Sequence, residues 1–379
     1  MCSFFSGGTP SSSKKEYYDG NIPFIRSGEL HDDQTELFIT EDGLKNSAAK
    51  MVEVGDLLLA LYGATSGDIA ISKINGAINQ AILCIRTEQS KKFIESIWYK
   101  HAGKLLQTYL QGGQGNLSAD IVKNISFYFA TIEEQKKLAK FISLLDERIS
   151  TQNKIIEDLK KLRSAIVDKL FCLPNELVPQ MRLHGFTGNW IQVRLSDVCQ
   201  RIRTKNINTQ CQLVLTIAAQ YGLVSQEDFF NKSIASDNLE GYYFIEKDDF
   251  AYNKSYSTDY PWGAVKRLEL YSQGVLSPLY ICFRPNTDII VPDYLSHYFE
   301  SKKWHKGIAD IAGEGARNHG LLNLSVVDFF NTTHRIPSMP EQKVIADILN
   351  KLTFKYDLEQ KLHKNLLKQR KYLLQQIFI

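Results

Sequence analysis

The chain has 379 residues, enough for about two to four domains that each bury a core. Hydrophobic residues make up 44% and charged residues 23%, as in ordinary globular proteins. No apolar run of about 18 residues predicts a membrane span, and no basic-then-apolar start predicts a signal peptide. The net charge of +3 is compatible with nucleic-acid binding but confines any such surface to a local basic patch.

The six cysteines are dispersed and form no metal-binding pattern. Zinc sites need closely spaced Cys and His ligands, and disulfide frameworks are typical of small secreted domains. No C-x-x-C pair or neighbouring histidine cluster accompanies the cysteines, which are Cys2, Cys84, Cys172, Cys199, Cys211 and Cys282. The sequence therefore predicts reduced thiols in a cytoplasmic protein, with no metal bound by this chain.

Residues 1–130 predict a first globular domain of mixed α and β structure. Short aliphatic and aromatic runs separated by Gly, Pro, Asn and Ser are typical of strands joined by turns. We expect strands at 57–62, 69–71, 81–85 and 125–129, and a helix at 93–110.

Residues 131–171 predict a long helix. Thr131 and Glu134 have the spacing of a capping box, in which both side chains bond free amides of the first turn. Apolar residues then recur at alternating spacings of three and four, the pattern of a coiled-coil seam. The seam positions of this helix are Leu138, Ile142, Leu145, Ile149, Ile156 and Leu159. Residues 172–189, rich in Pro, Gly and polar side chains, predict a linker.

Residues 190–337 predict a second domain and residues 338–379 a second long helix. We expect strands at 190–198, 213–217 and 279–283, and a helix at 292–306. Ser338 and Glu341 repeat the capping box, and Pro340 fits the first turn, where its missing N–H costs nothing. The seam positions here are Ile345, Leu349, Leu352, Tyr356, Leu366 and Leu373.

The two halves of the chain are related by an internal repeat. Residues 131–171 align with 338–378 at a constant shift of 207, and ten of the 41 positions are identical. Further upstream the shift changes: Cys84 matches Cys282 at 198, and Cys2 matches Cys199 at 197. Gap-free helices behind diverged front parts indicate one scaffold that carries two different surfaces.

Together these elements predict an α+β protein. We expect two globular α/β domains separated by two long antiparallel coiled-coil helices, with a pseudo-twofold internal repeat. Each helix would span about 60 Å at 1.5 Å per residue and hold the two domains a fixed distance apart. The alternative is a pair of ordinary amphipathic core helices, but two capped copies of this length favour the long helix pair.

Several segments resemble the specificity (HsdS) subunit of type I restriction–modification enzymes, over essentially the whole chain. They are Gly7-Gly8-Thr9-Pro10, the run from Tyr17 to Ile25, the run from Tyr62 to Gly67, Asn116-Leu117-Ser118, the helix start Glu134-Gln135, and the linker from Val178 to Trp190. One departure concerns the predicted opening strand at 190–198, which precedes Cys199 and has no equivalent ahead of Cys2. Either the N-terminus is shortened or another segment supplies that strand.

The resemblance implies two target-recognition domains, each reading one half of a split sequence in double-stranded DNA. It also implies that the paired helices dock two methyltransferase (M) subunits, which motor-nuclease (R) subunits join. S-adenosylmethionine, ATP and Mg would then belong to those partners, with no cofactor on this chain and no membrane contact.

Candidate DNA-binding residues are cationic and polar side chains of predicted loops, since such groups contact phosphates and base edges. In the first domain they are Lys14, Lys15, Tyr17, Tyr18, Arg26, Thr65, Ser66, Gln114 and Asn116. In the second they are Arg201, Arg203, Lys205, Lys254, Tyr256, Lys266, Arg267, Arg317, Asn318 and His319. Any one of them taken singly is more often an ordinary solvated surface residue.

Patterns for catalysis are weak. Residues 21–24 resemble a methyltransferase motif only superficially, and a nuclease pattern drawn from Asp293, Glu300 and Lys302 falls on a predicted helix, whereas the chemistry needs converging carboxylates. No Walker A loop predicts ATP use. A non-catalytic DNA-specificity subunit with a bipartite target is therefore favoured. The alternatives are a coiled-coil adaptor without specific DNA binding and a self-sufficient DNA-modifying enzyme.

Overall fold

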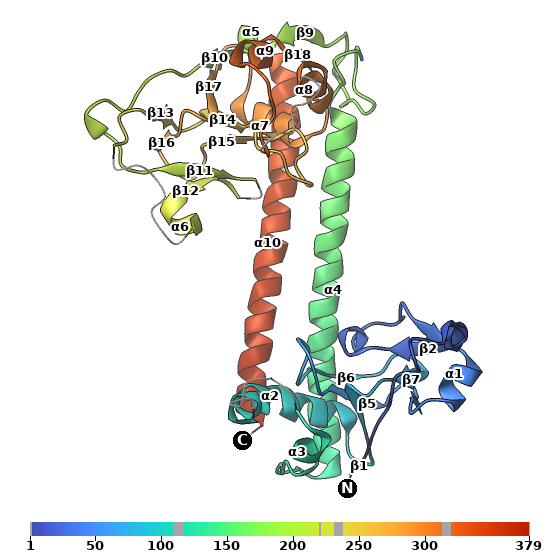
Figure 1. The fold of residues 1–379 in the computed structure, drawn as a ribbon. Helices are drawn as coiled ribbons and strands as arrows, with labels where there is room; N and C mark the ends of the chain where they lie inside the picture. The colour runs from blue at the N-terminus through green and yellow to red at the C-terminus, as the bar shows by residue number, and fades with distance from the viewer. Residues whose placement is uncertain (1, 110–116, 220, 231–237, 313–319, 379) are drawn as a thin grey trace. The chain divides into compact units, whose positions relative to one another are not determined.

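The computed structural model describes residues 2–109, 117–219, 221–230, 238–312 and 320–378. The chain divides into two compact units, one of Met1–Lys154 with Lys361–Ile379 and one of Ile155–Gln360. Both dividing points lie inside the long helices α4 (Ile132–Leu170) and α10 (Met339–Ile377), so each unit contains part of both helices (Figure 1). The predicted combination of mixed α and β structure with two long helices is confirmed.

The first unit contains two four-stranded sheets. One has the order β1-β8-β5-β6 and is antiparallel throughout, and the other has the order β3-β2-β7-β4 with a parallel β2–β7 pair. The strands are β1 (Cys2–Ser6), β2 (Tyr18–Ile25), β3 (Phe38–Ile39), β4 (Lys50–Val52), β5 (Leu57–Ala60), β6 (Ile69–Ile71), β7 (Gly76–Ile78) and β8 (Ile82–Thr87). The helices besides the long ones are α1 (Glu41–Lys45), α2 (Lys91–Tyr109) and α3 (Ala119–Lys123).

The second unit is built around one four-stranded sheet of order β10-β17-β14-β15, with two-stranded pairs β11-β12, β13-β16 and β9-β18. The strands are β9 (Ile191–Arg194), β10 (Cys199–Arg201), β11 (Leu215–Ala218), β12 (Gly222–Ser225), β13 (Tyr243–Glu246), β14 (Phe250–Asn253), β15 (Ala264–Arg267), β16 (Gln273–Leu276), β17 (Ile281–Pro285) and β18 (Thr333–Ile336). The shorter helices are α5 (Leu195–Val198), α6 (Gln226–Phe230), α7 (Pro292–Glu300), α8 (His305–Ile311) and α9 (Val326–Asn331).

The internal repeat predicted from the sequence is confirmed by the strand order. The order β1-β8-β5-β6 in the first unit matches β10-β17-β14-β15 in the second, and α2, α3 and α4 match α7, α9 and α10. An ion pair between neighbouring strands is duplicated as well. Arg86 Nη2 lies 2.7 Å from Asp56 Oδ2, and Arg284 Nε lies 2.6 Å from Asp249 Oδ1.

Helices α4 and α10 run antiparallel in each unit. In the first unit Arg370 donates to Asp146, and in the second unit Arg163 Nε donates to Thr353 Oγ1 at 3.1 Å. These two contacts are equivalent under the 207-residue shift, so the scaffold makes the same contact twice with a different acceptor. All twelve predicted seam side chains are buried or half-buried.

A buried glutamine near the start of each long helix explains why glutamine occurs at this position in both copies of the repeat. Gln342 Oε1 accepts from the Val291 amide at 2.8 Å, and its Nε2 donates to the carbonyls of Ile289 and Pro337 at 3.1 and 3.0 Å. Gln135 accepts from the Ser90 amide at 3.1 Å and donates to the Ala130 carbonyl at 2.8 Å. Both glutamines are 1% exposed. Each one therefore fixes the residue ahead of α2 or α7 to the start of the long helix.

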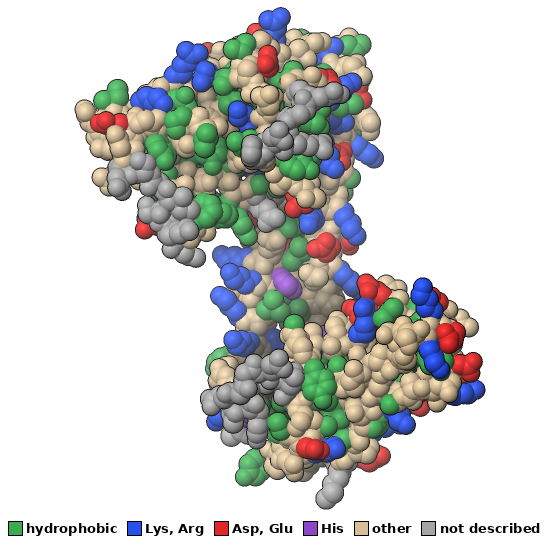
Figure 2. Space-filling model, in the orientation of Figure 1, with side chains coloured by type: hydrophobic (Ala, Val, Ile, Leu, Met, Phe, Trp, Pro, Cys, Tyr) green, Lys and Arg blue, Asp and Glu red, His purple; other side chains and the backbone are tan. Residues whose placement is uncertain are grey.

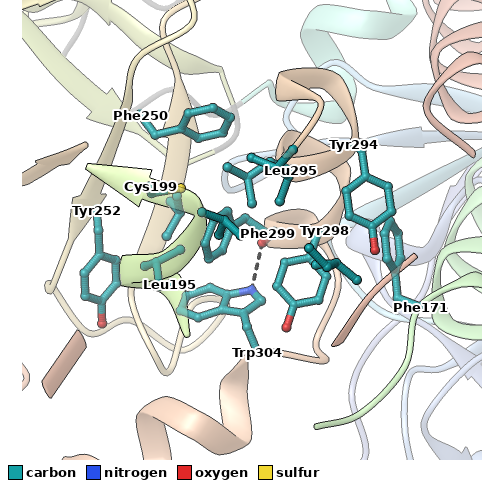
Figure 3. Packing of buried hydrophobic residues seen from close by; sticks show 14 of the residues in the cluster. Phe171, Leu195, Cys199, Phe250, Tyr252, Tyr294, Leu295, Tyr298, Phe299 and Trp304 are labelled. Atoms are coloured by element: carbon teal, nitrogen blue, oxygen red, sulfur yellow. Dashed lines mark hydrogen bonds between the residues drawn. The ribbon is translucent and has the colours of Figure 1, made fainter. Parts of the chain in front are cut away.

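The core of the second unit is rich in aromatic side chains. Figure 3 shows Phe250, Phe299 and Trp304 packed together, with the Trp304 indole donating to the Phe299 carbonyl at 2.9 Å. Phe171, from the end of α4, lies 5.3 Å from Tyr294 of α7 between ring centroids. Because aromatic rings bury large apolar areas, these contacts join the long helix firmly to the sheet domain.

The first unit makes the equivalent contact with the end of α10. Phe378 lies 5.3 Å from Phe93 of α2, the same centroid distance as between Phe171 and Tyr294. Leu374 and Ile142 share this apolar cluster. The C-terminal helix end therefore completes the core of the unit that begins at the N-terminus.

Replacing Tyr294 with phenylalanine is expected to stabilise the protein by about 1 kcal/mol, because its buried hydroxyl has no hydrogen-bond partner among the described residues. The repeat already places Phe93 at the equivalent position. Denaturant unfolding measures the change. Tyr298→Phe is the matched control and should be destabilising, since the Tyr298 hydroxyl bonds His334 Nδ1 at 2.8 Å. A loss of stability in Tyr294→Phe would contradict the prediction.

Three local predictions were wrong. Residues 125–129 form no strand. The helix predicted at 292–306 ends at Glu300, because Ser301 Oγ bonds the Tyr298 carbonyl at 2.6 Å, and a separate helix starts at His305. The opening strand predicted at 190–198 is strand only to Arg194, after which Asp197 accepts from the Arg194 amide and starts the short helix α5.

The capping boxes are also only partly formed. Thr131 Oγ1 accepts from the Glu134 amide at 3.4 Å, as predicted. The Glu341 carboxylate instead accepts from Arg182 Nη2 at 2.9 Å and from the Trp190 indole at 3.4 Å. The predicted linker 172–189 is thereby held against the start of α10, and Cys172 at its beginning is fully buried.

Candidate nucleic-acid interface

The glycine-rich segment near the N-terminus serves close packing. A Cβ atom on Gly7 would lie 1.8 Å from the Ile78 carbonyl oxygen, and one on Gly8 would lie 2.6 Å from the Ala48 Cβ. Only glycine fits such a close approach of one strand end to its neighbours. This segment places the following loop, which carries Lys14 and Lys15, at the start of β2.

The predicted DNA-binding residues on this loop differ in whether their side chains are exposed to solvent. Lys14 and Lys15 are exposed, and Lys14 Nζ lies 2.9 Å from the Tyr17 hydroxyl, a contact that raises the pKa of the lysine. Tyr17 is buried, and the Tyr18 hydroxyl donates to the Pro10 carbonyl at 2.6 Å. The two tyrosines thus order the loop, while the two lysines face solvent.

Arg26 lies in an acidic pocket. Its guanidinium is 2.9 Å from Glu29 and 2.6 Å from Glu36, and Asp32 and Asp33 line the same pocket. Burial works against ionisation of Glu29, but hydrogen bonds from Arg26 and neighbouring groups bring its pKa to about 2. The local charge is therefore negative at neutral pH and repels phosphate, which argues against a phosphate contact by Arg26.

In the loop after β5, Thr65 and Ser66 are half-buried. The Ser66 hydroxyl donates to the Leu61 carbonyl at 3.0 Å and closes the turn. Ser66 therefore has a structural contact that the sequence alone did not indicate.

In the second unit, three predicted cationic side chains stand without acidic partners in the described part of the chain. They are Arg201 at the end of β10, Arg203 two residues later, and Lys254 after β14. Tyr256, near Lys254, is 40% exposed. Arg203 is exposed and Arg201 and Lys254 are half-buried, so these three side chains offer positive charge that can contact phosphate.

Other predicted cations of the second unit are engaged in the fold. Arg267 lies 2.5 Å from Asp293 and 2.9 Å from Glu269, and its side chain is 13% exposed. Burial opposes its charge, but these acids keep the pKa of Arg267 above its ordinary value. Lys205 donates to the Gly241 carbonyl at 2.6 Å and lies over the Tyr243 ring, and the Lys266 side chain is 18% exposed beside Glu300.

Five predicted residues lie outside the described residues: Gln114, Asn116, Arg317, Asn318 and His319. Their assignment to DNA binding stays a prediction.

Sequence reasoning missed a basic stripe on α10. Residues 361–377 contain five Lys or Arg residues and no Asp or Glu, which is the signal that the sequence offered. Lys361, Lys364, Lys368 and Lys371 follow spacings of three, four and three, so they share one helix face. All four are exposed, none forms an ion pair in the described part of the chain, and Figure 2 shows Lys and Arg side chains gathered along this helix. Such a face attracts a polyanion or an acidic protein surface.

The two acids of the nuclease alternative are paired with cations. Asp293 pairs with Arg267, and Glu300 pairs with Arg163 and lies near Lys266. Across the described ranges, no group of three His, Cys, Asp or Glu side chains is arranged to hold a metal ion. No described helix has the length and apolar character needed to cross a membrane.

Comparison with known sequences relates this framework to restriction–modification systems. Residues 1–161 match the family model of the type I restriction modification DNA specificity domain. The chain is 27% identical over 203 residues to the type I restriction enzyme MjaVIII specificity subunit of Methanocaldococcus jannaschii, covering 52% of this chain and 46% of that one. It is 29% identical over 167 residues to the MjaIX specificity subunit of the same organism, covering 41% and 38%. This chain thus spans less than half the length of these relatives.

Two solved structures share the fold across the whole chain. The S subunit of a type I restriction-modification system from M. genitalium has a TM-score of 0.57 at 16% identity, covering 100% of this chain and 94% of that one. A chain from a study of complex assembly and conformational transition of the type I R-M system has a TM-score of 0.58 at 14% identity, covering 100% and 97%. Residues 1–161 are thus similar in sequence to type I restriction modification DNA specificity domains, and the chain as a whole has the fold of the S subunit from M. genitalium.

Proposed function

We propose that this chain is the DNA sequence-specificity subunit of a type I restriction–modification complex. In this role it reads a bipartite target with a non-specific spacer, docks two methyltransferase subunits, and has no catalytic site of its own. S-adenosylmethionine, ATP and Mg are bound by the partner subunits, and motor-nuclease subunits join through the complex. The protein acts in the cytoplasm, where its DNA target lies.

The observation that carries this proposal is the duplicated framework with diverged loops. The four-stranded sheet, the glutamine contact and the long helix occur twice, whereas the sheet β3-β2-β7-β4 of the first unit has no four-stranded equivalent among the described strands of the second. A repeated scaffold that carries two different surfaces suits two different half-sites. A protein that recognised two copies of one sequence would need no such divergence.

Exposed apolar side chains on the long helices support docking of protein partners. In the first unit they include Leu144 and Tyr372, which are 55% and 61% exposed, and in the second unit Phe354, which is 66% exposed. Apolar residues of this size on a helix surface favour contact with another protein. The same observation favours the second candidate, a coiled-coil adaptor, so DNA selection has to distinguish the two.

The test is selection from a random-sequence DNA pool, with and without a cognate methyltransferase subunit, at two salt concentrations. The proposal expects an enriched split motif that sharpens when the partner is present. One continuous enriched motif would contradict the bipartite target. Binding that disappears at higher salt without any enriched motif would indicate phosphate contact alone and would favour the adaptor.

The double variant Arg201→Ala/Arg203→Ala is expected to weaken DNA binding about tenfold at low salt. It should also reduce the slope of log Kobs against log salt by about 2, one unit for each lost phosphate contact. Fluorescence anisotropy at several salt concentrations measures both effects. Lys351→Ala is the control, because this lysine is already paired with Asp347 at 2.6 Å. An unchanged slope in the double variant would remove both arginines from the interface.

A further inference from the structure

Residues 126–129 lack the strand partner that their counterparts have. In the second unit, β18 pairs antiparallel with β9, with Thr333 opposite Arg194 and Ile336 opposite Ile191. Under the 207-residue shift, β18 corresponds to residues 126–129. These four residues adopt no strand and form no backbone hydrogen bond with any other residue that the structure describes.

The side chains of this segment nevertheless alternate as in a strand. Phe127 contacts His101 with ring centroids 5.6 Å apart, and Phe129 contacts Phe93 at 5.8 Å. Tyr128 between them is 97% exposed. One face is thus supported by the core, while the backbone edge is free to pair. Phe129 itself is 44% exposed, whereas its counterpart Ile336 is 3% exposed.

Glu134, at the start of α4, also lacks the contact that its counterpart Glu341 makes. In the second unit Glu341 is 1% exposed and contacts the indole of Trp190, the residue directly ahead of β9. The equivalent residue of the first unit, Glu134, is exposed, and no tryptophan contacts it among the described residues. In the second unit one short segment supplies both the strand and the tryptophan. One added segment of this kind would therefore supply both contacts.

The second unit also shows which side chains and elements such a segment contains. After β9 the chain forms the helical turn α5, whose Leu195 and Val198 are 1% and 2% exposed. The segment then runs directly into Cys199 of β10. A peptide segment of this kind consists of a tryptophan, a four-residue strand and one helical turn with two apolar side chains.

We propose that Ser126–Phe129 and Glu134 form an acceptor site for a peptide segment with the chemistry of Trp190–Val198. The segment adds to residues 126–129 as an antiparallel strand, its indole N–H donates to Glu134, and its helical turn covers the aromatic face around Phe129. Strand addition to a free edge derives affinity from main-chain hydrogen bonds and specificity from the alternating side chains. The inference is independent of the proposed function, because it rests on strand pairing and involves no DNA contact.

The first experiment titrates the full chain with a fluorescent peptide of the sequence of residues 189–198, Asn-Trp-Ile-Gln-Val-Arg-Leu-Ser-Asp-Val. Saturable binding is expected, together with amide exchange at Phe127 and Phe129 that slows at least about tenfold, since the register of β18 and β9 directs these two amides toward the added strand. Exchange at Thr333–Ile336 should not change, which separates the acceptor site from displacement of the chain's own β9. A scrambled peptide is the ligand control. The chain variant Phe129→Pro removes an amide donor that the register of β18 and β9 places toward the added strand, and should lose binding while keeping its helical content.

The second experiment joins the same ten residues in place of Met1, directly ahead of Cys2, as residues 189–198 precede Cys199. The fusion is expected to raise the Tm by at least about 3 °C and to protect the same two amides, whereas a scrambled fusion should do neither. Protection in the fusion alone would still support the acceptor site, since attachment raises the effective concentration. If neither peptide nor fusion protects Phe127 and Phe129 in a folded protein, the proposal is overturned.

Discussion

Replacing Gln342 with leucine is expected to lower the free energy of unfolding by about 3–5 kcal/mol, because three buried backbone groups lose their partner at once. The side chain holds the Val291 amide and the carbonyls of Ile289 and Pro337, and leucine can satisfy none of them. Each buried polar group left unpaired costs about 1–3 kcal/mol, and partial relaxation brings the sum toward the lower values.

Urea unfolding followed by circular dichroism measures this loss. Gln376→Leu is the matched control, because this glutamine is exposed on the same helix and the substitution is expected to change stability by less than about 0.5 kcal/mol. Gln342→Glu tests the direction of the hydrogen bonds. A carboxylate can accept from the Val291 amide but cannot donate to the two carbonyls, so it should also be strongly destabilising. If the Gln342→Leu protein is as stable as the control, the hydrogen bonds of Gln342 do not stabilise the contact between α7 and α10.

The free energy of unfolding is expected to fall by about 2 kcal/mol between pH 7.5 and pH 5 through His334 alone. Burial lowers the pKa of this histidine from 6.5 to about 4 in the folded protein. The unfolded chain therefore binds a proton as the pH falls through 6.5, while the folded chain stays neutral until about pH 4. Below both values the total loss from this group reaches about 3 kcal/mol.

The hydrogen bonds of His334 suit the neutral imidazole. Its Nδ1 lies 2.8 Å from the Tyr298 hydroxyl and its Nε2 lies 2.8 Å from the Thr332 hydroxyl, with no carboxylate bonded to either nitrogen. The acids with strongly lowered pKa values, Glu29 and Glu300, are near 2 and so lose their stabilising charge only at lower pH. The window from pH 7.5 to pH 5 thus lies above the titration of these two acids, but burial raises the pKa of Glu95, so the contribution of His334 is obtained by comparison with a His334 variant.

The test compares the pH dependence of urea unfolding in the native sequence and in His334→Gln. The variant should be less stable at pH 7.5 but should lose about 2 kcal/mol less on acidification to pH 5. A residual slope is expected, because burial also lowers the pKa values of His101 and His305. Equal slopes in the two proteins would mean that His334 already takes up its proton in the folded state at ordinary pH.

The sequence by itself determined the elements whose signal is local and periodic. The spacing of apolar residues over 131–171 and 338–378 was sufficient to predict both long helices, since helix formation along one amphipathic face depends on neighbours within two turns. The repeat was equally visible, because ten identities survive at a constant shift of 207. The strands β5 and β6 followed from short apolar runs bounded by turn residues.

Tertiary structure decided everything that depends on a distant partner. Residues 125–129 have the composition of a strand, but a strand forms only when a neighbour supplies hydrogen bonds, and no described residue does so here. Glu341 has the spacing of a capping residue, yet Arg182 and Trp190 approach from the preceding segment and bind its carboxylate. The sequence also did not show which cationic residues pair with acids inside the fold. Arg203 and Arg267 look alike in the sequence, and only the approach of Asp293 and Glu269 makes Arg267 a structural residue.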